Sequence, residues 1–198
     1  MMAKMTDNKR AGFVAILGAP NVGKSTLINR LVGAKVSIVS PKVQTTRARV
    51  RGIRIVGAAQ LVLVDTPGIF HDAKRRLERA MVHAAWSGAQ DADAILLLID
   101  AERGLDSNTR NIRDGLIKSG RKAVVAINKI DQVAHEKLLP LAASLDDGAS
   151  TERIFMISAL DGHGVEDLLD HLVGLLPKGP WLYPEDQLSD MPERLLAA

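Results

Sequence analysis

A glycine-bounded loop between an apolar run and a helical pattern constrains this chain more than any other feature. The loop has the pattern G-x-x-x-x-G-K-[ST], and its residues are Gly18, Ala19, Pro20, Asn21, Val22, Gly23, Lys24 and Ser25. An apolar run over 13–17 precedes the loop, and the residues from Thr26 to Val32 continue it as a predicted helix. A buried strand, a tight loop and a helix in this order are typical of a phosphate-binding P-loop. The alternative interpretation is a glycine-rich turn that binds no ligand.

The residue types in this loop suit the binding of phosphates. Backbone N–H groups must converge on an anion, and a Cβ atom at Gly18 or Gly23 would obstruct that wrapping. The start of the following helix adds the positive end of its dipole. Lys24 supplies a mobile positive charge for the outer phosphates, and the Ser25 hydroxyl is a hard oxygen ligand of the kind that Mg²⁺ prefers. We therefore expect nucleotide phosphates and Mg²⁺ at this loop.

Apolar runs alternate with helical patterns along the chain, which predicts an α/β fold. The predicted strands cover residues 12–17, 47–56, 60–65, 94–99, 123–127 and 154–157. The predicted helices cover residues 24–32, a segment that ends near residue 89, and residues 107–118, 133–145 and 165–176, with Pro140 as a kink or cap. Unbroken Val/Ile/Leu strands indicate a mainly parallel sheet with both faces covered. We therefore expect three layers, with a six-stranded sheet between helices on both faces.

One strand of this sheet should run against the others. The turn over 57–59 is so short that the strands on either side of it should pair antiparallel. A change of the exposed face near Gly52 predicts a bulge in the first of these two strands. In open α/β sheets ligands bind at the carboxyl ends of the strands, so the loops there should form one site.

The tetrapeptide Asn128-Lys129-Ile130-Asp131 follows a predicted strand and indicates which base is bound. The Asp131 carboxylate can accept hydrogen bonds from the N1–H and 2-amino groups of guanine, a pair that adenine lacks. Asn128 can tie this loop to the P-loop, and the aliphatic part of Lys129 can cover the base. The alternative is a polar loop with a capping aspartate.

Three residues after the last predicted strand are weaker candidates for the same base: Ser158, Ala159 and Leu160. Their backbone N–H groups could reach the guanine O6 atom. Taken alone, the tripeptide is more typical of an ordinary strand end.

The segment Asp65-Thr66-Pro67-Gly68 ends another apolar strand. We expect Asp65 to hold Mg²⁺ through a water molecule and the Gly68 N–H group to contact the γ-phosphate. The alternative is that Asp65 is an N-cap for the loop that follows. Thr45 and Thr46 lie in an aperiodic loop, and one of them, with Thr46 favoured, should reach Mg²⁺ when a γ-phosphate is present. Two solvent-facing hydroxyls are the alternative there.

Composition limits the classes of protein to which the chain can belong. It has 26 Lys and Arg against 23 Asp and Glu, so its formal charge is +3, which permits a nucleic-acid or membrane-surface partner without requiring one. It has no cysteine, which excludes disulfides and thiolate zinc sites. We see no signal peptide or spanning apolar run, and we expect a soluble cytoplasmic chain.

The predicted parts are a flexible arm over 1–11, a nucleotide-binding domain over 12–176 and a proline-rich linker over 177–198.

Together the motifs resemble the Ras-like translation-factor class of GTPases. Within it, the P-loop through Leu27, the segment Gln44-Thr45-Thr46-Arg47 and the segment 65–69 are similar to the Era family, and the similarity runs from about Gly12 to the end. The resemblance implies a bacterial enzyme that hydrolyses GTP to GDP and phosphate, binds small-subunit ribosomal RNA and assists 30S assembly. It also implies a cytoplasmic location, with peripheral association at the inner membrane left open. Era proteins bind RNA through a C-terminal KH domain, and this chain stops before it.

The catalytic candidates are Lys24, Thr46 and Gly68. Ras-type enzymes place a glutamine after the D-x-x-G segment to orient the attacking water, and this chain has Ile69 there. We therefore predict slow intrinsic hydrolysis, with the water positioned by backbone groups, a partner or a cation. For Asn21 the resemblance implies a K⁺ site, and a loop-shaping side chain is the alternative. A guanine-nucleotide-binding regulatory module with negligible turnover, and an ATP-using P-loop enzyme such as a kinase, stay open as functions.

Overall fold

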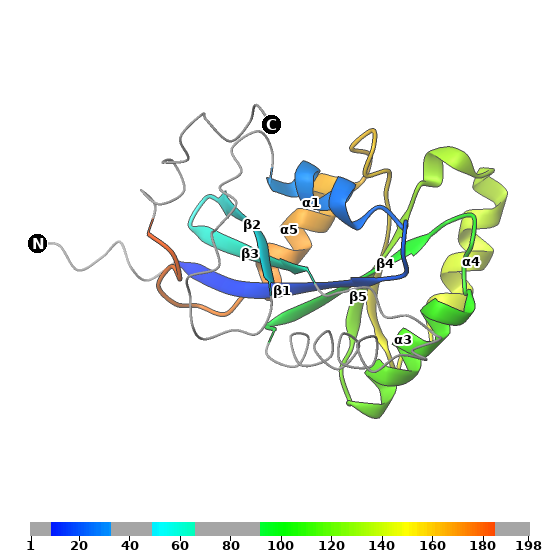
Figure 1. Ribbon diagram of the computed structural model, residues 1–198, viewed down its shortest axis with the longest axis horizontal. Helices are drawn as coiled ribbons and strands as arrows, with labels where there is room; N and C mark the ends of the chain where they lie inside the picture. The colour runs from blue at the N-terminus through cyan, green and yellow to red at the C-terminus, as the bar shows by residue number, and fades with distance from the viewer. Residues whose placement is uncertain (1–8, 33–48, 66–91, 185–198) are drawn as a thin grey trace, which may run out of the picture.

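The computed structural model of this chain describes residues 9–32, 49–65 and 92–184. Their centre is a six-stranded sheet with strand order β2-β3-β1-β4-β5-β6 (Figure 1). The strands are β1 (Arg10–Gly18), β2 (Arg49–Val56), β3 (Ala59–Asp65), β4 (Ala94–Asp100), β5 (Ala123–Asn128) and β6 (Thr151–Met156). The helices are α1 (Lys24–Val32), α3 (Ser107–Lys118), α4 (Leu138–Leu145) and α5 (Val165–Leu175), with short 3-10 helices η1 (Ile130–Gln132) and η2 (His135–Lys137).

The predicted mixture of strand directions is confirmed. β1 runs parallel to β3 and β4, and β4, β5 and β6 also run parallel to one another. β2 pairs antiparallel with β3, and the register between them shifts between Val50 and Gly52, where the bulge was predicted. The parallel strands therefore end at a common edge, to which the loops after β1, β5 and β6 belong.

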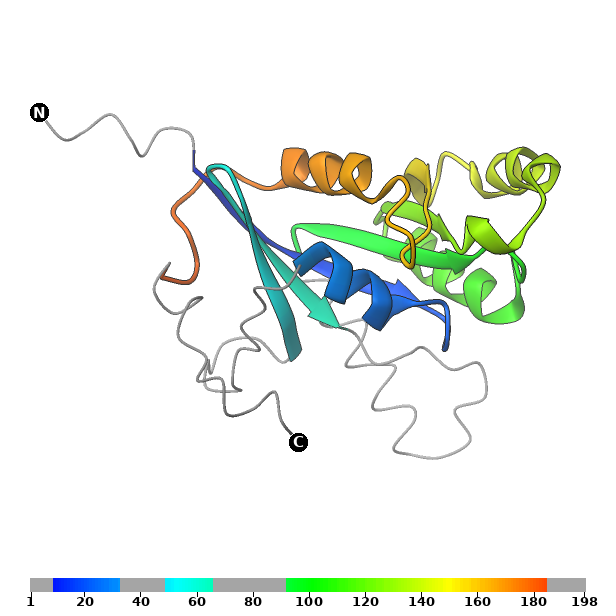
Figure 2. The same cartoon turned by 90° about the horizontal axis from the view of Figure 1, so that it is seen from above.

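Helices cover both faces of the sheet, as the apolar strands predict. α1 and α5 pack on one face, where Leu27 and Leu168 meet Val14 of β1 in one core cluster. α3 and α4 pack on the other face, where Ile112 meets Leu17 of the same strand. Neighbouring residues of a strand point to opposite faces, and this alternation divides the apolar core into two layers. Figure 2, seen from above, shows α1 and α5 on the near side of the sheet.

The first strand begins at Arg10, two residues before its predicted start, so residues 10 and 11 are part of the domain rather than of a flexible arm. Long-range bonds explain the difference. The Arg10 side chain donates to the carbonyls of Gly174 and Leu176, and the Ala11 N–H group donates to the Pro177 carbonyl. A reading of local composition cannot reveal partners that lie so far along the chain.

The start of the predicted linker is also held on the domain. Gln60 of β3 is fully buried, and its side-chain oxygen accepts hydrogen bonds from the N–H groups of Leu182 and Tyr183 at 2.8 and 2.9 Å. Its side-chain nitrogen donates to the Tyr183 carbonyl at 2.8 Å. The Trp181 indole donates to the Ala58 carbonyl, and Tyr183 packs in a cluster with Ile53. Residues 181–183 thus lie against the β2–β3 hairpin.

Two further boundaries differ from the prediction. The predicted helix over 133–145 is divided into η2 and α4, and Pro140 lies in the first turn of α4, where its missing N–H group breaks no helical bond. β6 begins at Thr151, three residues before its predicted start. The helix predicted to end near residue 89 lies outside the described residues.

Candidate functional site

The carboxyl ends of the parallel strands bring the predicted motifs to one edge of the sheet. β1 ends at Gly18 in the P-loop, β3 ends at Asp65, and β5 ends at Asn128. The register pairs Asp65 with Ile16, two residues before Gly18, and pairs Asn128 with Asp100 at the end of β4. Segments that are more than 100 residues apart in the sequence therefore share one edge, as the fold class predicts.

The P-loop glycines are required by the protein around them. Gly23 has φ +95°, and a Cβ atom there would collide with the side-chain nitrogen of Asn128. A Cβ atom at Gly18 would lie 2.7 Å from the Leu98 carbonyl oxygen. These collisions occur without any anion in place, so the glycines serve the packing of the loop against β4 and β5. Asn21 also has positive φ, at 64°, a conformation that asparagine tolerates better than most residues.

Lys24 is held at the P-loop by the loop's own carbonyl groups. Its Nζ atom donates to the Gly18 and Ala19 carbonyls, each at 2.8 Å. α1 begins at Lys24, and the Leu27 N–H group makes the first helical bond, to the Gly23 carbonyl. The ammonium group therefore lies beside a helix N-terminus, and both features favour a bound phosphate.

Asn128 joins the P-loop to two other loops. Only 2% of the residue is exposed, and its Nδ2 atom donates to the Val22 carbonyl at 2.8 Å, which confirms the predicted tie. Its Oδ1 atom accepts the Ala159 N–H group at 2.8 Å. The Asn128 carbonyl oxygen accepts the Ala101 N–H group. One side chain thus sets the spacing between the phosphate loop, the tetrapeptide over 128–131 and the loop after β6.

An ion pair that the sequence analysis missed holds Lys129. This residue has φ +66°, and its Nζ atom lies 2.6 Å from a carboxylate oxygen of Asp100, which is 3% exposed. Burial opposes ionisation of Asp100, but hydrogen bonds from Lys129 and the Glu102 N–H group outweigh it and hold the pKa of Asp100 below its ordinary value. An aspartate at the end of an apolar strand is the signal that could have indicated a buried partner.

The remaining base-recognition candidates occupy the two loops that Asn128 joins. Asp131 is exposed on η1, three residues after Asn128. Ser158 and Ala159 are buried, and their N–H groups already donate to His163 and Asn128, whereas Leu160 is 64% exposed. Of these three backbone amides, the Leu160 N–H group is the one with no acceptor within the described residues. It is therefore the amide of this loop that remains for a ligand.

Of the residues predicted to hold Mg²⁺, Ser25 is the one whose side chain the structure describes. Ser25 and Thr26 are exposed in the first turn of α1, beside Lys24. Mg²⁺ at a nucleotide is usually held by one or two protein groups together with phosphates and water, so the Ser25 hydroxyl fits such an ion. Among the residues that the structure describes, no three His, Asp or Glu side chains form a metal-binding group.

Several predicted site residues cannot be placed. Thr45, Thr46, Thr66, Pro67, Gly68 and Ile69 lie outside the described residues, as does the side chain of Asp65. Asn21 and Pro20 are described, and the Arg103 guanidinium donates to the Pro20 carbonyl at 3.3 Å. The role of Asn21 in holding K⁺ stays a prediction.

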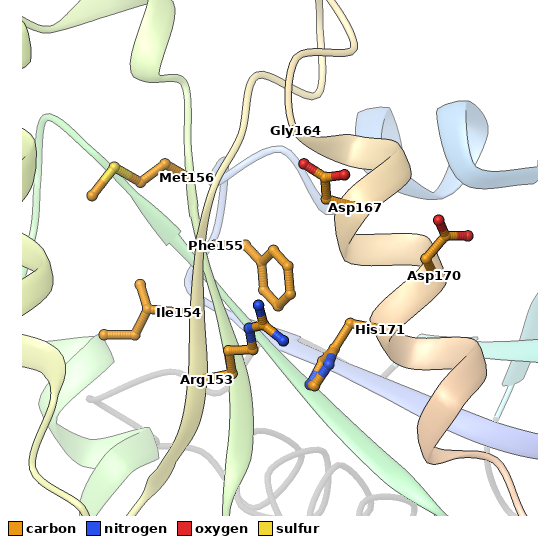
Figure 3. Close-up of a pocket in the computed structure, with 8 residues that line it drawn as sticks. All are labelled: Arg153, Ile154, Phe155, Met156, Gly164, Asp167, Asp170 and His171. Atoms are coloured by element: carbon orange, nitrogen blue, oxygen red, sulfur yellow. The ribbon is translucent and has the colours of Figure 1, made fainter.

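A hollow of about 480 Å³ lies between β6 and α5. Figure 3 shows Arg153 and Phe155 on the strand facing Asp167, Asp170 and His171 on the helix. The Arg153 guanidinium lies over the Phe155 ring at 5.2 Å, and the two aspartates are exposed. Two carboxylates at the rim would repel phosphates, so the nucleotide site is not placed here.

Within the described residues, no helix has the length and apolar character needed to cross a membrane.

Comparison with known proteins agrees with this geometry. A family model described as 50S ribosome-binding GTPase matches residues 13–129. GTPase Era from Rhizobium meliloti is 61% identical over 189 residues, which cover 96% of this chain and 60% of the relative. GTPase Era from Agrobacterium fabrum is also 61% identical, over 96% of this chain and 59% of the relative. The chain thus spans about 60% of the length of these curated relatives.

Solved structures show the same likeness. A variant of Aquifex aeolicus Era bound to GDP·AlF₄⁻ has a TM-score of 0.76 and 42% identity, over 96% of this chain and 64% of that chain. Era in complex with MgGDPNP and nucleotides 1506–1542 of 16S ribosomal RNA has a TM-score of 0.77 and 42% identity, over 96% of this chain and 65% of that one. The G domain of the FeoB iron transporter of T. maritima, 22% identical with a TM-score of 0.59, shares the fold.

Proposed function

We propose that this chain, which belongs to the 50S ribosome-binding GTPase family, binds guanine nucleotides at the carboxyl edge of its sheet and hydrolyses GTP to GDP and phosphate. The observation that carries the proposal is the 2.8 Å hydrogen bond from Asn128 to the Val22 carbonyl. This bond joins the tetrapeptide over 128–131, which we propose selects the base, to the loop over 18–25. A single nucleotide can then contact both at once, with its phosphates on one and its base on the other.

The chain offers a separate group for each part of the nucleotide. Lys24 and the backbone N–H groups of residues 21–25 bind the phosphates, and the Ser25 hydroxyl would hold Mg²⁺, which compensates phosphate charge when bound. The Asp131 carboxylate selects guanine through the N1–H and 2-amino groups. The Lys129 ammonium is tied to Asp100, so its aliphatic part is held in place to cover the base.

The groups assigned to the γ-phosphate complete the site. Thr46 is proposed as a second Mg²⁺ ligand in the GTP state, and Asp65 as a support for the ion through water. The Gly68 N–H group is proposed to contact the γ-phosphate, in a segment that also includes Thr66 and Pro67. Loss of the phosphate would release both loops, which is how nucleotide state is converted into a change of surface.

Hydrolysis is proposed to be slow without help. Ile69 occupies the position at which Ras-type enzymes have glutamine, and its side chain cannot orient a water molecule. A cation held near Asn21 would supply the missing positive charge. Hydrolysis measured in KCl and in NaCl at equal ionic strength tests this part, and equal rates in the two salts would exclude a role for K⁺.

The proposed output is a switch in assembly of the small ribosomal subunit. The relatives are Era GTPases, and the structure of Era with MgGDPNP contains a fragment of 16S ribosomal RNA. Because this chain spans about 60% of those relatives, we assign to it the nucleotide-dependent part and leave the RNA grip to the KH domain of the family. The proposal places the protein in the cytoplasm and leaves open whether it also contacts the inner membrane peripherally.

A second candidate is a regulatory module that binds guanine nucleotides with negligible turnover, which Ile69 favours. Competition of GTP and ATP for the chain tests the shared claim, and preference for ATP would refute it. Single-turnover hydrolysis then separates the two candidates. Release of phosphate from bound GTP supports the enzyme, and persistence of intact GTP supports the module.

A further inference from the structure

Arg30 of α1 lies outside every motif, yet it holds the loop that follows β6. Its Nε atom donates to the Ala159 carbonyl oxygen at 2.6 Å, and the guanidinium also donates to the Leu160 carbonyl oxygen. Both views of the fold show the loop between β6 and α5 beside α1 (Figures 1 and 2). The side chain therefore links the helix that follows the P-loop to a loop about 130 residues away.

The loop is shaped to receive this guanidinium. Gly162 has φ +94°, and a Cβ atom there would lie 2.9 Å from a terminal nitrogen of Arg30. The turn is closed by the bond from the Gly162 N–H group to the Ser158 carbonyl at 2.8 Å, and the Asp161 N–H group donates to the Ser158 hydroxyl. A Cβ atom at residue 162 would therefore require the guanidinium to shift, and the positive φ also favours glycine there.

The bond to the Ala159 carbonyl also fixes the direction of an N–H group. The Ala159 carbonyl and the Leu160 N–H belong to one planar trans peptide unit, in which they point in opposite directions. With the oxygen held by Arg30, the Leu160 N–H group points away from this arginine. On the other side of Ala159, its own N–H group is held by Asn128 at 2.8 Å. Two side chains thus hold the two peptide units that flank Ala159.

We infer that Arg30 is a positioning residue for base recognition, because it aims the Leu160 N–H group at the O6 atom of a bound guanine. The inference rests on the proposed function and adds to it a residue that no motif contains. Arg30 itself does not touch the nucleotide. It acts through the peptide unit between Ala159 and Leu160, so its removal should weaken the recognition of O6 more than the binding of the rest of the nucleotide.

The test compares GDP with 6-thio-GDP, which keeps the N1–H and 2-amino groups but has sulfur, a weak acceptor, in place of O6. Binding of both with Mg²⁺ is measured by titration calorimetry. The wild-type chain should prefer GDP by about two- to tenfold, the usual effect of one neutral hydrogen bond. The Arg30→Ala protein should bind the two nucleotides almost equally, and Arg30→Lys, which keeps one donor group, should retain part of the preference.

Arg10→Ala is the matched control. Arg10 also donates to two backbone carbonyls, those of Gly174 and Leu176 at the end of α5, at 3.0 and 2.7 Å. It lies at the amino end of β1, at the opposite edge of the sheet. This variant loses a comparable pair of bonds and should keep the wild-type ratio of GDP to 6-thio-GDP affinity. A drop in the ratio of the control would mean that general loosening of the fold, and not aim at O6, determines it.

Each outcome bears on one claim. An Arg30→Ala protein with the wild-type ratio, or a wild-type chain that binds both nucleotides equally, overturns the inference but leaves guanine-nucleotide binding intact. A wild-type chain that binds neither nucleotide overturns the proposed function itself. If Arg30→Ala does not fold, the ratio of GDP to 6-thio-GDP affinity is measured on Arg30→Lys instead. A wild-type ratio in that variant would contradict a role for the hydrogen bonds from Arg30 to the Ala159 and Leu160 carbonyls.

Discussion

Replacement of Asn128 by alanine should disrupt the junction of the three loops. The Nδ2 atom of Asn128 donates to the Val22 carbonyl, and its Oδ1 atom accepts the Ala159 N–H group. Val22 and Ala159 are 1% and 2% exposed, so water cannot easily replace the lost partners. A buried polar group without a partner costs about 1–3 kcal/mol. Two such groups should lower the free energy of unfolding by about 2–6 kcal/mol, a large part of the roughly 5–15 kcal/mol that stabilises a typical domain.

Thermal unfolding with and without GDP measures both consequences of Asn128→Ala. The Tm of the free protein should fall by about 4 °C or more, since 1 kcal/mol corresponds to about 2–4 °C in a domain of this size. The rise of Tm on addition of GDP should also shrink, because ligand stabilisation follows the ratio of ligand concentration to Kd. Asn29→Ala is the control, since Asn29 is exposed on α1. A variant that melts with the wild-type chain and gains the same Tm from GDP would refute the junction.

Three further predictions test other parts of the account. Gly23→Ala should abolish detectable GDP binding in calorimetry, because the added Cβ atom collides with Asn128 and φ is +95°; unchanged affinity would contradict the packing argument. Asp131→Asn should lower the affinity for GDP and raise the affinity for XDP, the xanthine nucleotide. A site built around a pair of hydrogen bonds rejects a base that cannot form them by roughly 10⁴-fold or more, so the preference for GDP over XDP should reverse. An unaltered order of affinities would exclude this carboxylate as the base selector. Burial opposes ionisation of Asp147, but hydrogen bonds from Ser150 and the ion pair with Arg113 outweigh it and lower the pKa of Asp147; a lowered folded pKa adds stability above the unfolded pKa of about 3.9. Asp147→Asn should therefore lower the free energy of unfolding at pH 7, and the difference from wild type should shrink as the pH falls below about 4. Chemical denaturation across this pH range measures the difference, and a constant value would contradict the ion pair.

Much of the sheet could be predicted because each strand is a separate apolar run. Val14 is buried on one face of the sheet and Leu17 on the other. An apolar run of this kind is typical of a parallel strand that is covered on both faces. The P-loop and the tetrapeptide that starts at Asn128 could be predicted for a similar reason, since their spacing and their place after a strand are local. The fold then brings them together at one edge without further information.

What the sequence analysis missed depends on contacts between distant residues. Three contacts were missed: the ion pair of Lys129 with Asp100, the hydrogen bond from Arg30 to the Ala159 carbonyl, and the hydrogen bonds between Gln60 and Tyr183. Each forms only once the sheet has its register and the helix or the segment over 181–183 is packed on it. No residue type or spacing marks these partners in advance. The start of β1 also differs from the prediction for this reason, because distant hydrogen bonds hold Arg10 in the strand.

The central claim is that one guanine nucleotide is bound by the P-loop and by the loop that Asn128 joins to it. A crystal structure of this chain with GDP and Mg²⁺ tests it most directly. The account predicts phosphates surrounded by the amides of residues 18–25 near Lys24, and an Asp131 carboxylate within hydrogen-bond distance of the guanine N1 and 2-amino nitrogens. A nucleotide bound at the P-loop with its base directed away from Asp131 would contradict the account.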